Sequence, residues 1–446
     1  MIPMARQMKD SGVEWIGEIP EEWSSRKLKT LVQESNCLFI DGDWIESKDI
    51  SPDGIRYYTT GNVGDGVFKE QGAGYISEDT FQQLNCTEVR GGDLVFSRLN
   101  LPVGRACIIP AIERCVVAVD IVIARLNSQC INKYVVYATM CDRYQALTSI
   151  LARGTTMQRI SRTQMGNIYF PMTSYAEQKS IVIYLDAKCT EIDKVVAQTR
   201  ATIEEYKKLK QAIITEAVTK GVRGARPMKP SGVEWIGDIP EEWMICSIKR
   251  GVSKVGSGKT PSGGAEVYLN EGVLFLRSQN IYDTGLLLDN VTYISESTDE
   301  EMSGTRVFAD DVLLNITGAS IGRCCVYPAD LPPANVNQHV CIIRTVNSIF
   351  TADYMHYFWI SFAGKTSIQL YQTGGNREGM SADAIKNTLI PRMDISEQQE
   401  ITIYLDTKCA EIDRIIEKKE QLIEELGSYK KSLIYEYVTG KKEVTA

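Results

Sequence analysis

A chain of 446 residues exceeds the size of one ordinary hydrophobic core, so we expect it to fold as about two to four domains. Its apolar fraction of 43% and charged fraction of 24% are typical of soluble globular proteins, and no apolar run is long enough for a membrane span. The net charge of -8 excludes a uniformly basic nucleic-acid binder, because contact with phosphates would need a local patch of Lys and Arg.

Cysteine and histidine usage indicates a reduced chain without a structural metal. The 12 cysteines include no C-x-x-C pair, which favours buried thiols over disulfides or zinc ligands. The 2 histidines, His339 and His356, are too few for most zinc sites, and we expect both to be structural. The first residues, MIPMARQMKDSG, lack the apolar core of a secretory signal, so we expect a cytoplasmic location.

The first recognisable element, MKDSGVEWIGEIPEEW at 8–23, returns as MKPSGVEWIGDIPEEW at 228–243, about 220 residues later. Each copy carries two tryptophans, and we expect them to pack the segment against its own domain, because large aromatic side chains commonly anchor loops. EQKSIVIYLDAKCTEID at 177–193 returns at the same spacing as EQQEITIYLDTKCAEID at 397–413. The chain therefore contains one repeat of about 220 residues twice.

The regions between these blocks, 24–170 and 244–390, match each other only at scattered positions. Short β-rich runs such as DLVFSRL, VVAVDIVIARL, VLFLRSQNI and DVLLNIT alternate with turns rich in Gly, Asn and Asp. KYVVYATMCDRYQALTSIL at 133–151 and ADYMHYFWISFAGKTSIQL at 352–370 lie at equivalent places, and both patterns indicate helix. We expect two mixed α/β domains that share a fold and differ in their surfaces.

A long helix is predicted to follow each globular region, beginning at Tyr175 and at Ile395. Apolar residues there recur at alternating spacings of four and three, a coiled-coil pattern interrupted by Lys408 and Lys419. In the second helix this seam comprises Ile401, Leu405, Ile412, Ile415, Leu422, Leu426, Tyr429 and Leu433. Each helix would have about 45 residues and a length of about 65 Å. We expect the two helices to pair antiparallel about a pseudo-twofold axis, with one globular domain at each end.

Several motifs in combination resemble the specificity subunit of type I restriction–modification systems. They are GVEWIGEIPEEW and GVEWIGDIPEEW, the FLRSQNIYDTG run at 275–285, the GSGKTPSGG loop at 256–264, and EQ..I..YLD.K..EID at the start of each long helix. The resemblance covers essentially the whole chain, in the order of the family. It implies six segments: an N-terminal segment at 1–23, target recognition domain 1 at 24–170, a central long helix at 171–222, a repeat of the N-terminal segment at 223–243, target recognition domain 2 at 244–390, and a C-terminal long helix at 391–446.

The resemblance also implies a function. Each target recognition domain would read one half of a bipartite site in double-stranded DNA, while the helices set the spacer between the half-sites and dock two methyltransferase subunits. Restriction subunits, which carry the motor and the nuclease, would join for cleavage. The chain itself would have no catalytic centre and no cofactor. S-adenosylmethionine would bind the methyltransferase subunits, and ATP and Mg²⁺ would bind the restriction subunits.

The motifs that would support other chemistry are incomplete. GSGKT at 256–260 has Ser253 where a P-loop needs its first Gly, and Pro261 interrupts the required helix, so a flexible basic loop that approaches phosphate is favoured. The nuclease pattern of Pro-Asp followed by an acidic-x-Lys triplet is incomplete after Pro52, and LPPAN at 331–335 lacks both flanks of a methyltransferase motif. Two alternatives stay open: a coiled-coil scaffold whose end domains bind proteins and not DNA, and an active methyltransferase or nuclease.

Reading of base edges needs paired donors and acceptors, so the candidate residues are Arg, Lys, Asn, Gln and Thr in turns between strands. In the first domain the candidates are Thr59, Thr60, Asn62, Arg98, Asn100, Arg153, Thr155, Gln158 and Arg159. In the second domain they are Lys259, Thr260, Arg277, Gln279, Asn280, Asn376 and Arg377. Matched pairs such as Asn62 with Asn280 and Arg105 with Arg323 are expected to serve the shared fold or to contact phosphate.

Overall fold

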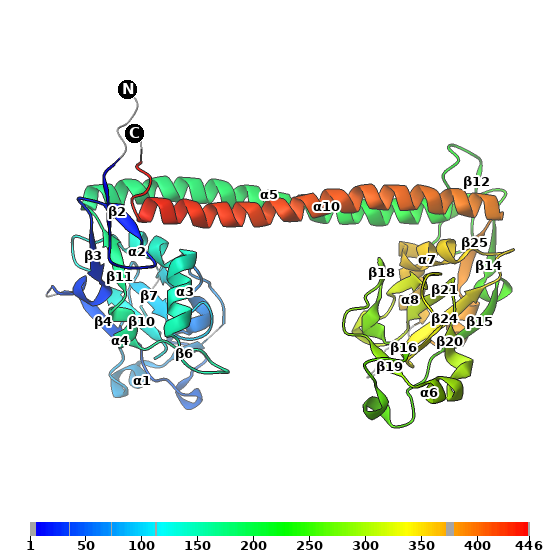
Figure 1. The fold of residues 1–446 in the computed structure, drawn as a ribbon, viewed down its shortest axis with the longest axis horizontal. Helices are drawn as coiled ribbons and strands as arrows, with labels where there is room; N and C mark the ends of the chain where they lie inside the picture. The colour runs from blue at the N-terminus through cyan, green and yellow to red at the C-terminus, as the bar shows by residue number, and fades with distance from the viewer. Residues whose placement is uncertain (1–5, 35, 73, 112–113, 372–378, 445–446) are drawn as a thin grey trace. The chain divides into compact units, whose positions relative to one another are not determined.

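The computed structural model describes residues 6–34, 36–72, 74–111, 114–371 and 379–444. The chain divides into two compact units: unit 1 comprises Met1–Thr199 with Glu420–Ala446, and unit 2 comprises Arg200–Lys419. Each unit therefore contains one globular region together with a part of each long helix (Figure 1). The predicted mixed α/β fold with two repeated domains and two long helices is confirmed.

The globular region of unit 1 is built on two sheets. The antiparallel sheet has the order β4 (Leu38–Asp41), β10 (Ile121–Arg125), β7 (Leu94–Ser97) and β8 (Ala106–Ile108). The mixed sheet has the order β6 (Gly74–Ile76), β5 (Ile55–Tyr58) and β9 (Cys115–Val117). Two short pairs join β1 (Met8–Asp10) with β2 (Glu18–Pro20), and β3 (Ser24–Lys27) with β11 (Tyr169–Met172). The helices are α1 (Glu78–Gln83), α2 (Asn132–Thr139), α3 (Asp142–Leu151) and α4 (Arg162–Gly166).

The globular region of unit 2 repeats this plan with additional strands. One sheet has the order β15 (Val252–Ser257), β24 (Val340–Thr345), β21 (Asp311–Asn315) and β22 (Cys324–Val326). The other has the order β19 (Thr292–Ile294), β16 (Val273–Leu276), β23 (Ala334–Val336) and β20 (Arg306–Val307). Three short pairs join β12 (Met228–Pro230) with β13 (Asp238–Pro240), β14 (Met244–Ser247) with β25 (Leu389–Arg392), and β17 (Ile281–Tyr282) with β18 (Gly285–Leu286). The helices are α6 (Glu296–Glu301), α7 (Ala352–Ile360), α8 (Phe362–Tyr371) and α9 (Ala382–Asn387).

Each of the two predicted helical stretches is a pair of helices. In unit 2 the break lies at Ser361, whose hydroxyl donates to the carbonyl of Phe358 at 2.6 Å and accepts from the N–H of Gly364 at 3.1 Å. Serine competes in this way with the helical hydrogen bonds of the backbone and starts a new helix. The same division separates α2 from α3 in unit 1.

The repeated tryptophans pack against their own units, as the sequence predicts. Trp15, Trp23 and Trp243 are buried, and Trp235 is half-buried with its indole N–H donated to Ser367 at 2.9 Å. The indole of Trp23 donates to a carboxylate at the start of α5, and that of Trp243 donates to the equivalent carboxylate of α10, each at 3.0 Å. The repeated segments are thereby attached to the first turns of the long helices.

The long helices begin where the sequence predicts, α5 at Tyr175–Lys220 and α10 at Ile395–Val438. In unit 1, Lys430 pairs with Asp193 at 2.6 Å, and the rings of Tyr437 and Tyr184 lie 4.5 Å apart. Residue numbers thus rise along one helix as they fall along the other, so the helix parts are antiparallel within the unit. The equivalent contacts in unit 2 are Lys210–Asp413 at 2.7 Å and Lys419–Tyr206 at 5.9 Å.

The apolar seam of the long helices is covered mainly by the globular cores. Ile401 and Leu405 are buried in the core of unit 2 together with side chains of α7 and β24. Further along α10, Ile415, Leu422 and Tyr429 are 37%, 40% and 55% exposed. The predicted pairing of the helices therefore accounts for only part of the buried stripe, and the globular cores bury another part. A regular helix drifts by about 20° per heptad, so part of the stripe turns away from its neighbour. Among the described residues, no helix is long and apolar enough to cross a membrane.

Candidate nucleic-acid interface

The two globular regions share backbone hydrogen bonds at the ends of the central strands of their main sheets, β7 and β10 in unit 1 and β21 and β24 in unit 2. These bonds define equivalent positions. In unit 1 the N–H of Arg98 donates to the carbonyl of Asp120 at 2.8 Å. In unit 2 the N–H of Ile316 donates to the carbonyl of His339 at 2.9 Å. Each unit then forms an isolated bridge from the next residue, Leu99 to Arg159 in unit 1 and Thr317 to Gly379 in unit 2. The scaffold is therefore common to both units, and the side chains on it differ.

In unit 1 these positions carry a cluster of charges. The side chain of Arg98 is 8% exposed, and its guanidinium pairs with Asp41 at 2.6 Å and with Asp120 at 3.4 Å. Arg159 pairs with Asp120 at 2.7 Å, and Arg162 pairs with Asp41 at 3.5 Å. The side chains of Arg159 and Arg162 are 47% and 42% exposed, so two arginines face solvent above a buried one.

A hairpin that follows α3 forms one wall of a cleft over this cluster. Arg153 and Arg159 exchange two backbone hydrogen bonds of 2.9 Å, and the N–H of Asn100 donates to the carbonyl of Gln158 at 3.0 Å. Gly154 has φ +107°, and a Cβ there would lie 2.4 Å from the carbonyl of Met157, so the tight turn requires glycine. The cleft has a volume of about 740 Å³ and is lined by Arg98, Arg153, Gly154, Met157, Arg159, Ser161 and Gln164.

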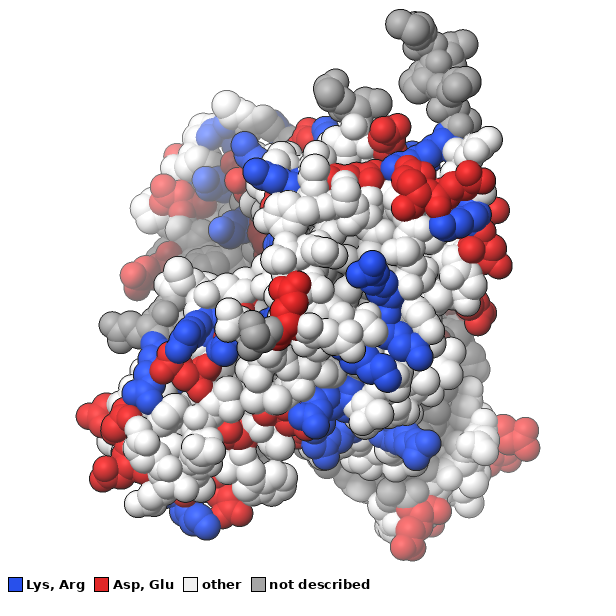
Figure 2. Space-filling view, turned by 90° about the vertical axis from the view of Figure 1, so that its left-hand side faces the viewer, with Lys and Arg blue, Asp and Glu red and all other residues white. Residues whose placement is uncertain are grey.

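The structure thus gathers six of the nine candidates of the first domain at one place. Arg98, Asn100, Arg153, Gln158 and Arg159 surround the cleft or its hairpin, and Thr155 lies exposed in the same turn. In Figure 2, which views the molecule from the left of Figure 1, Lys and Arg gather in the middle and lower part of the face, and acidic side chains are more numerous toward its edges. This distribution is compatible with the local basic patch that contact with a nucleic acid would need.

The other three candidates of the first domain form a turn that is internally bonded. The amide of Asn62 is buried, accepts from the N–H of Thr59 at 2.9 Å and donates to the carbonyls of Lys69 and Gln71 at 2.8 Å. Thr59 is exposed and Thr60 is half-buried. Because the amide of Asn62 is used inside the protein, it holds the turn and leaves these two threonines as its outer side chains.

Unit 2 repeats this turn. Asn280 is buried, accepts from the N–H of Arg277 at 3.0 Å and donates to the carbonyl of Leu287 at 2.9 Å. Gln279 in the same turn is exposed, and the guanidinium of Arg277 lies 5.7 Å from the ring centroid of Tyr268. The matched asparagines therefore serve the shared fold, Gln279 is the exposed member of the group, and Arg277 is half-buried.

The first two residues of the GSGKT motif end β15, and the other three follow that strand. A Cβ on Gly258 would lie 1.9 Å from the carbonyl of Val336, so glycine lets the two backbones approach each other. Lys259 is exposed, and the hydroxyl of Thr260 donates to the side chain of Gln338 at 2.5 Å. The remaining candidates of the second domain, Asn376 and Arg377, lie outside the described residues.

The sequence alone does not point to several polar side chains at the shared positions. In unit 1 these are Asp41, Asp120 and Arg162. In unit 2 they are Thr317, Gln338 and His339, with the hydroxyl of Thr317 2.5 Å from Nδ1 of His339. Asp41, Asp120 and His339 are not of the residue types expected to read bases. Arg162, Thr317 and Gln338 are of those types, and only the structure places them beside these turns. Their position could have identified them, because each of these residues lies beside a matched backbone turn and differs between the repeats.

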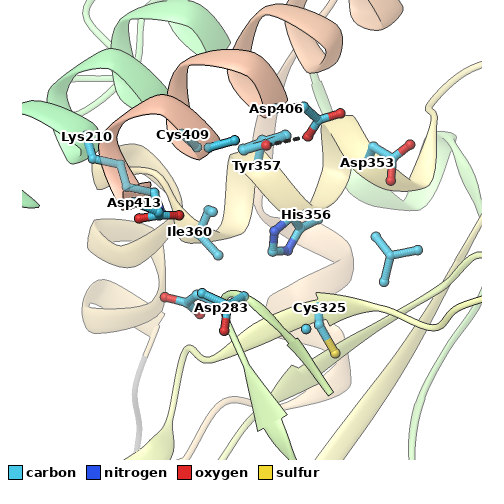
Figure 3. Close-up of a pocket in the computed structure, with 14 residues that line it drawn as sticks. Lys210, Asp283, Cys325, Asp353, His356, Tyr357, Ile360, Asp406, Cys409 and Asp413 are labelled. Carbon is cyan, nitrogen blue, oxygen red and sulfur yellow. Dashed lines mark hydrogen bonds and ion pairs between the residues drawn. The ribbon is translucent and has the colours of Figure 1, made fainter. Parts of the chain in front are cut away.

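A separate cavity in unit 2 bears on the enzymatic alternative (Figure 3). It has a volume of about 360 Å³, and the labelled side chains of His356, Tyr357, Asp406 and Cys325 lie around it. Burial lowers the pKa of His356 to about 4 and raises the pKa of Cys325 to about 12. Burial also raises the pKa of Tyr357, whose hydroxyl donates to Asp406 at 2.6 Å. At neutral pH the imidazole of His356, the thiol of Cys325 and the phenol of Tyr357 therefore stay uncharged, and neither Cys325 nor Tyr357 is an activated nucleophile.

Comparisons with known proteins agree with this architecture. The family described as "Type I restriction modification DNA specificity domain" matches the chain twice, at residues 20–205 and 240–425. The chain is 24% identical over 441 residues, 96% of each protein, to a specificity subunit assigned to the MjaX type I restriction enzyme of Methanocaldococcus jannaschii. It is 23% identical over 298 residues, 65% of this chain and 61% of the other, to the type I restriction enzyme EcoBI specificity subunit of Escherichia coli.

Two solved structures share the fold. A chain from work on complex assembly and conformational transition of the type I R-M system has a TM-score of 0.72 at 14% identity, covering 95% of this chain and 99% of that one. The HsdS subunit from Thermoanaerobacter tengcongensis has a TM-score of 0.52 at 16% identity, covering 95% and 98%.

Proposed function

Because the chain belongs to the type I restriction–modification DNA specificity family, we propose that each of its globular regions reads one half of a bipartite site in double-stranded DNA. One observation carries the proposal: equivalent backbone positions, held by the same hydrogen bonds, present Arg98 and Asp120 in unit 1 but Ile316 and His339 in unit 2. A shared scaffold with different side chains at one face is what two readers of different sequences need.

The partners follow from the same proposal. The chain would act without a catalytic centre or cofactor of its own, and two methyltransferase subunits would dock on the repeated helices and supply S-adenosylmethionine. Restriction subunits with ATP and Mg²⁺ would join them for cleavage. The location would be cytoplasmic.

Exchange of one domain tests whether each domain reads its own half-site independently. Residues 24–170 would be replaced by the equivalent region of another specificity subunit, and the methylated motif of the reconstituted methyltransferase would be mapped on genomic DNA. We expect one half-site to change and the other to stay the same. The reciprocal exchange of residues 244–390 is the matched control and should alter the other half-site. A change of both half-sites in either exchange would contradict independent reading.

The scaffold alternative makes a different prediction for binding. A domain that reads DNA neutralises phosphates, so the affinity of the assembled complex for duplex DNA should fall steeply as salt increases. Binding of protein partners with no affinity for duplex DNA at any salt concentration would favour the scaffold.

We further propose that the long helices set the length of the spacer. Seven residues would be inserted after Lys207 in α5, and seven in α10 between Asp413 and Lys430, so that the ion pairs on either side of the inserted turns are kept. Each helix would lengthen by about 10 Å, close to three base-pair steps. The expected result is a longer unspecific spacer with both half-sites unchanged. An active variant that keeps the original spacer would show that another feature measures the gap.

A further inference from the structure

We propose that the cleft of unit 1 reads a G·C base pair in the major groove, with Arg159 donating to guanine and with Asp120 and Arg98 as positioning residues. This inference rests on the proposed function, since it names the base pair that one domain would recognise. Its basis is the chain of contacts in which Arg98 holds Asp120 and Asp120 holds Arg159.

The exposed fractions of the three side chains indicate which of them can contact DNA. Arg98 is 8% exposed, Asp120 is 23% exposed and Arg159 is 47% exposed. The arginine at the outer end is the one able to reach DNA. A guanidinium has five N–H donors in a planar fork, so Arg159 can keep its pair with Asp120 along one edge and offer another edge to O6 and N7 of guanine. Asp120, which Arg98 fixes from below, would limit the rotamers of Arg159 before DNA arrives.

The carboxylate beside Arg159 favours a base edge over a phosphate at this arginine. Asp120 lies 2.7 Å from Arg159 and already neutralises part of the charge that would attract a phosphate to it. The edge of a guanine carries no net charge and presents two acceptors, so it can bind Arg159 without displacing Asp120.

Comparison with unit 2 shows that the cluster is not needed for the fold. At the equivalent backbone positions unit 2 has Ile316, His339 and Gly379 in place of Arg98, Asp120 and Arg159. The hydrogen bonds of the backbone are the same in both units. Three charged residues that can all be replaced without loss of the scaffold fit a role in discrimination between bases. The same comparison predicts that the second half-site is not read by an arginine at this position.

The test uses the full-length chain in the reconstituted methyltransferase complex, with a library of duplexes randomised in the first half-site. The wild-type complex should select guanine at one position. R159A and R159K should each reduce selection of that guanine by about ten- to a hundredfold and leave the second half-site unchanged, since lysine cannot make the bidentate contact. D120N should reduce the same selection by a smaller factor, because Arg159 stays in place with fewer constraints.

The salt dependence separates a base contact from a phosphate contact. Loss of a base contact leaves the slope of affinity against salt unchanged, whereas loss of a phosphate contact lowers it by about one. The matched control is R90A, which removes an arginine of unit 1 that is 69% exposed and paired with Glu88, and which should not change the motif. R159Q, a smaller change at the exposed position, repeats the test if R159A does not fold.

Two results would overturn the inference. One is an unchanged motif in R159A, R159K or R159Q; the other is uniform weakening on all sequences with a lower salt slope. A wild-type complex that binds no DNA sequence specifically would instead overturn the proposed function itself.

Discussion

Units 1 and 2 hold their turns with the same side chains and line their outer faces with different ones. Asn62 and Asn280 each accept from the N–H three residues earlier and donate to the carbonyl seven residues later. The hydroxyls of Tyr134 and Tyr354 donate to carbonyls near the ends of α10 and α5, respectively. The cleft of unit 1, in contrast, is charged at places where unit 2 has Ile316, His339 and Gly379. The comparison separates residues that specify the fold from residues that are free to specify a ligand.

The largest expected difference in stability between the two units lies at the carboxylates that begin the long helices. Glu397 is 2% exposed and pairs with Arg226 at 2.6 Å, whereas its counterpart Glu177 is 25% exposed and pairs with Arg6 at 2.7 Å. Removal of a buried partner leaves a buried charge, so E397A should cost about 3 kcal/mol, and E177A should cost about 1 kcal/mol because solvent screens its pair.

Hydrogen exchange would measure this difference locally, in residues 228–243 for E397A and in residues 8–23 for E177A, since unfolding of a chain with two units need not be two-state. E397Q is the control that keeps the shape of the side chain. Equal loss of protection in both segments would show that exposure does not distinguish the two carboxylates.

Acid stability should also differ between the units. Burial lowers the pKa of His356 from 6.5 to about 4, and the equivalent position of unit 1 is Val136. Below pH 6.5 the unfolded chain takes up a proton that the folded chain refuses until about pH 4. The free energy of unfolding therefore decreases by up to about 3 kcal/mol as the pH is lowered from 6.5 to about 4. H356V should remove most of this loss, and V136H should create a similar one in unit 1.

The measurement is hydrogen exchange in α7 and α2 between pH 7 and pH 4, corrected for the intrinsic rate. Nearby carboxylates, among them Asp283 and Asp406, favour the protonated histidine and reduce the effect. An acid response of α7 that is unchanged in H356V would show that other groups control it.

The regular elements could be predicted from the sequence because their signals are local. The periodic apolar residues that follow Tyr175 and Ile395 gave the starts of α5 and α10 correctly. The coverage of the helices was not predictable, because it depends on which core lies beside each turn. The sequence also did not show that Asp120 and His339 occupy equivalent positions. The repeats differ by one residue in length just before β9, so alignment at the offset of the preceding residues pairs Asp120 with Gln338.

Exposed apolar residues of the repeated helices give the last and smallest prediction. Ile183 of α5 is 60% exposed and Ile403, its counterpart in α10, is 66% exposed. An aliphatic side chain exposed at the same place in both repeats fits a surface that binds two copies of one partner, which we propose to be the methyltransferase subunit. Burial of an isoleucine contributes about 1.5–3 kcal/mol, so I183A and I403A should each weaken one of the two binding events by about tenfold.

Mass photometry of the assembled complex should show one methyltransferase subunit lost at low concentration in either single variant and both lost in the double variant. V67A, which shortens a 57% exposed side chain elsewhere in unit 1, is the control and should leave two subunits bound. Full occupancy of both sites in the double variant would remove this surface from the interface.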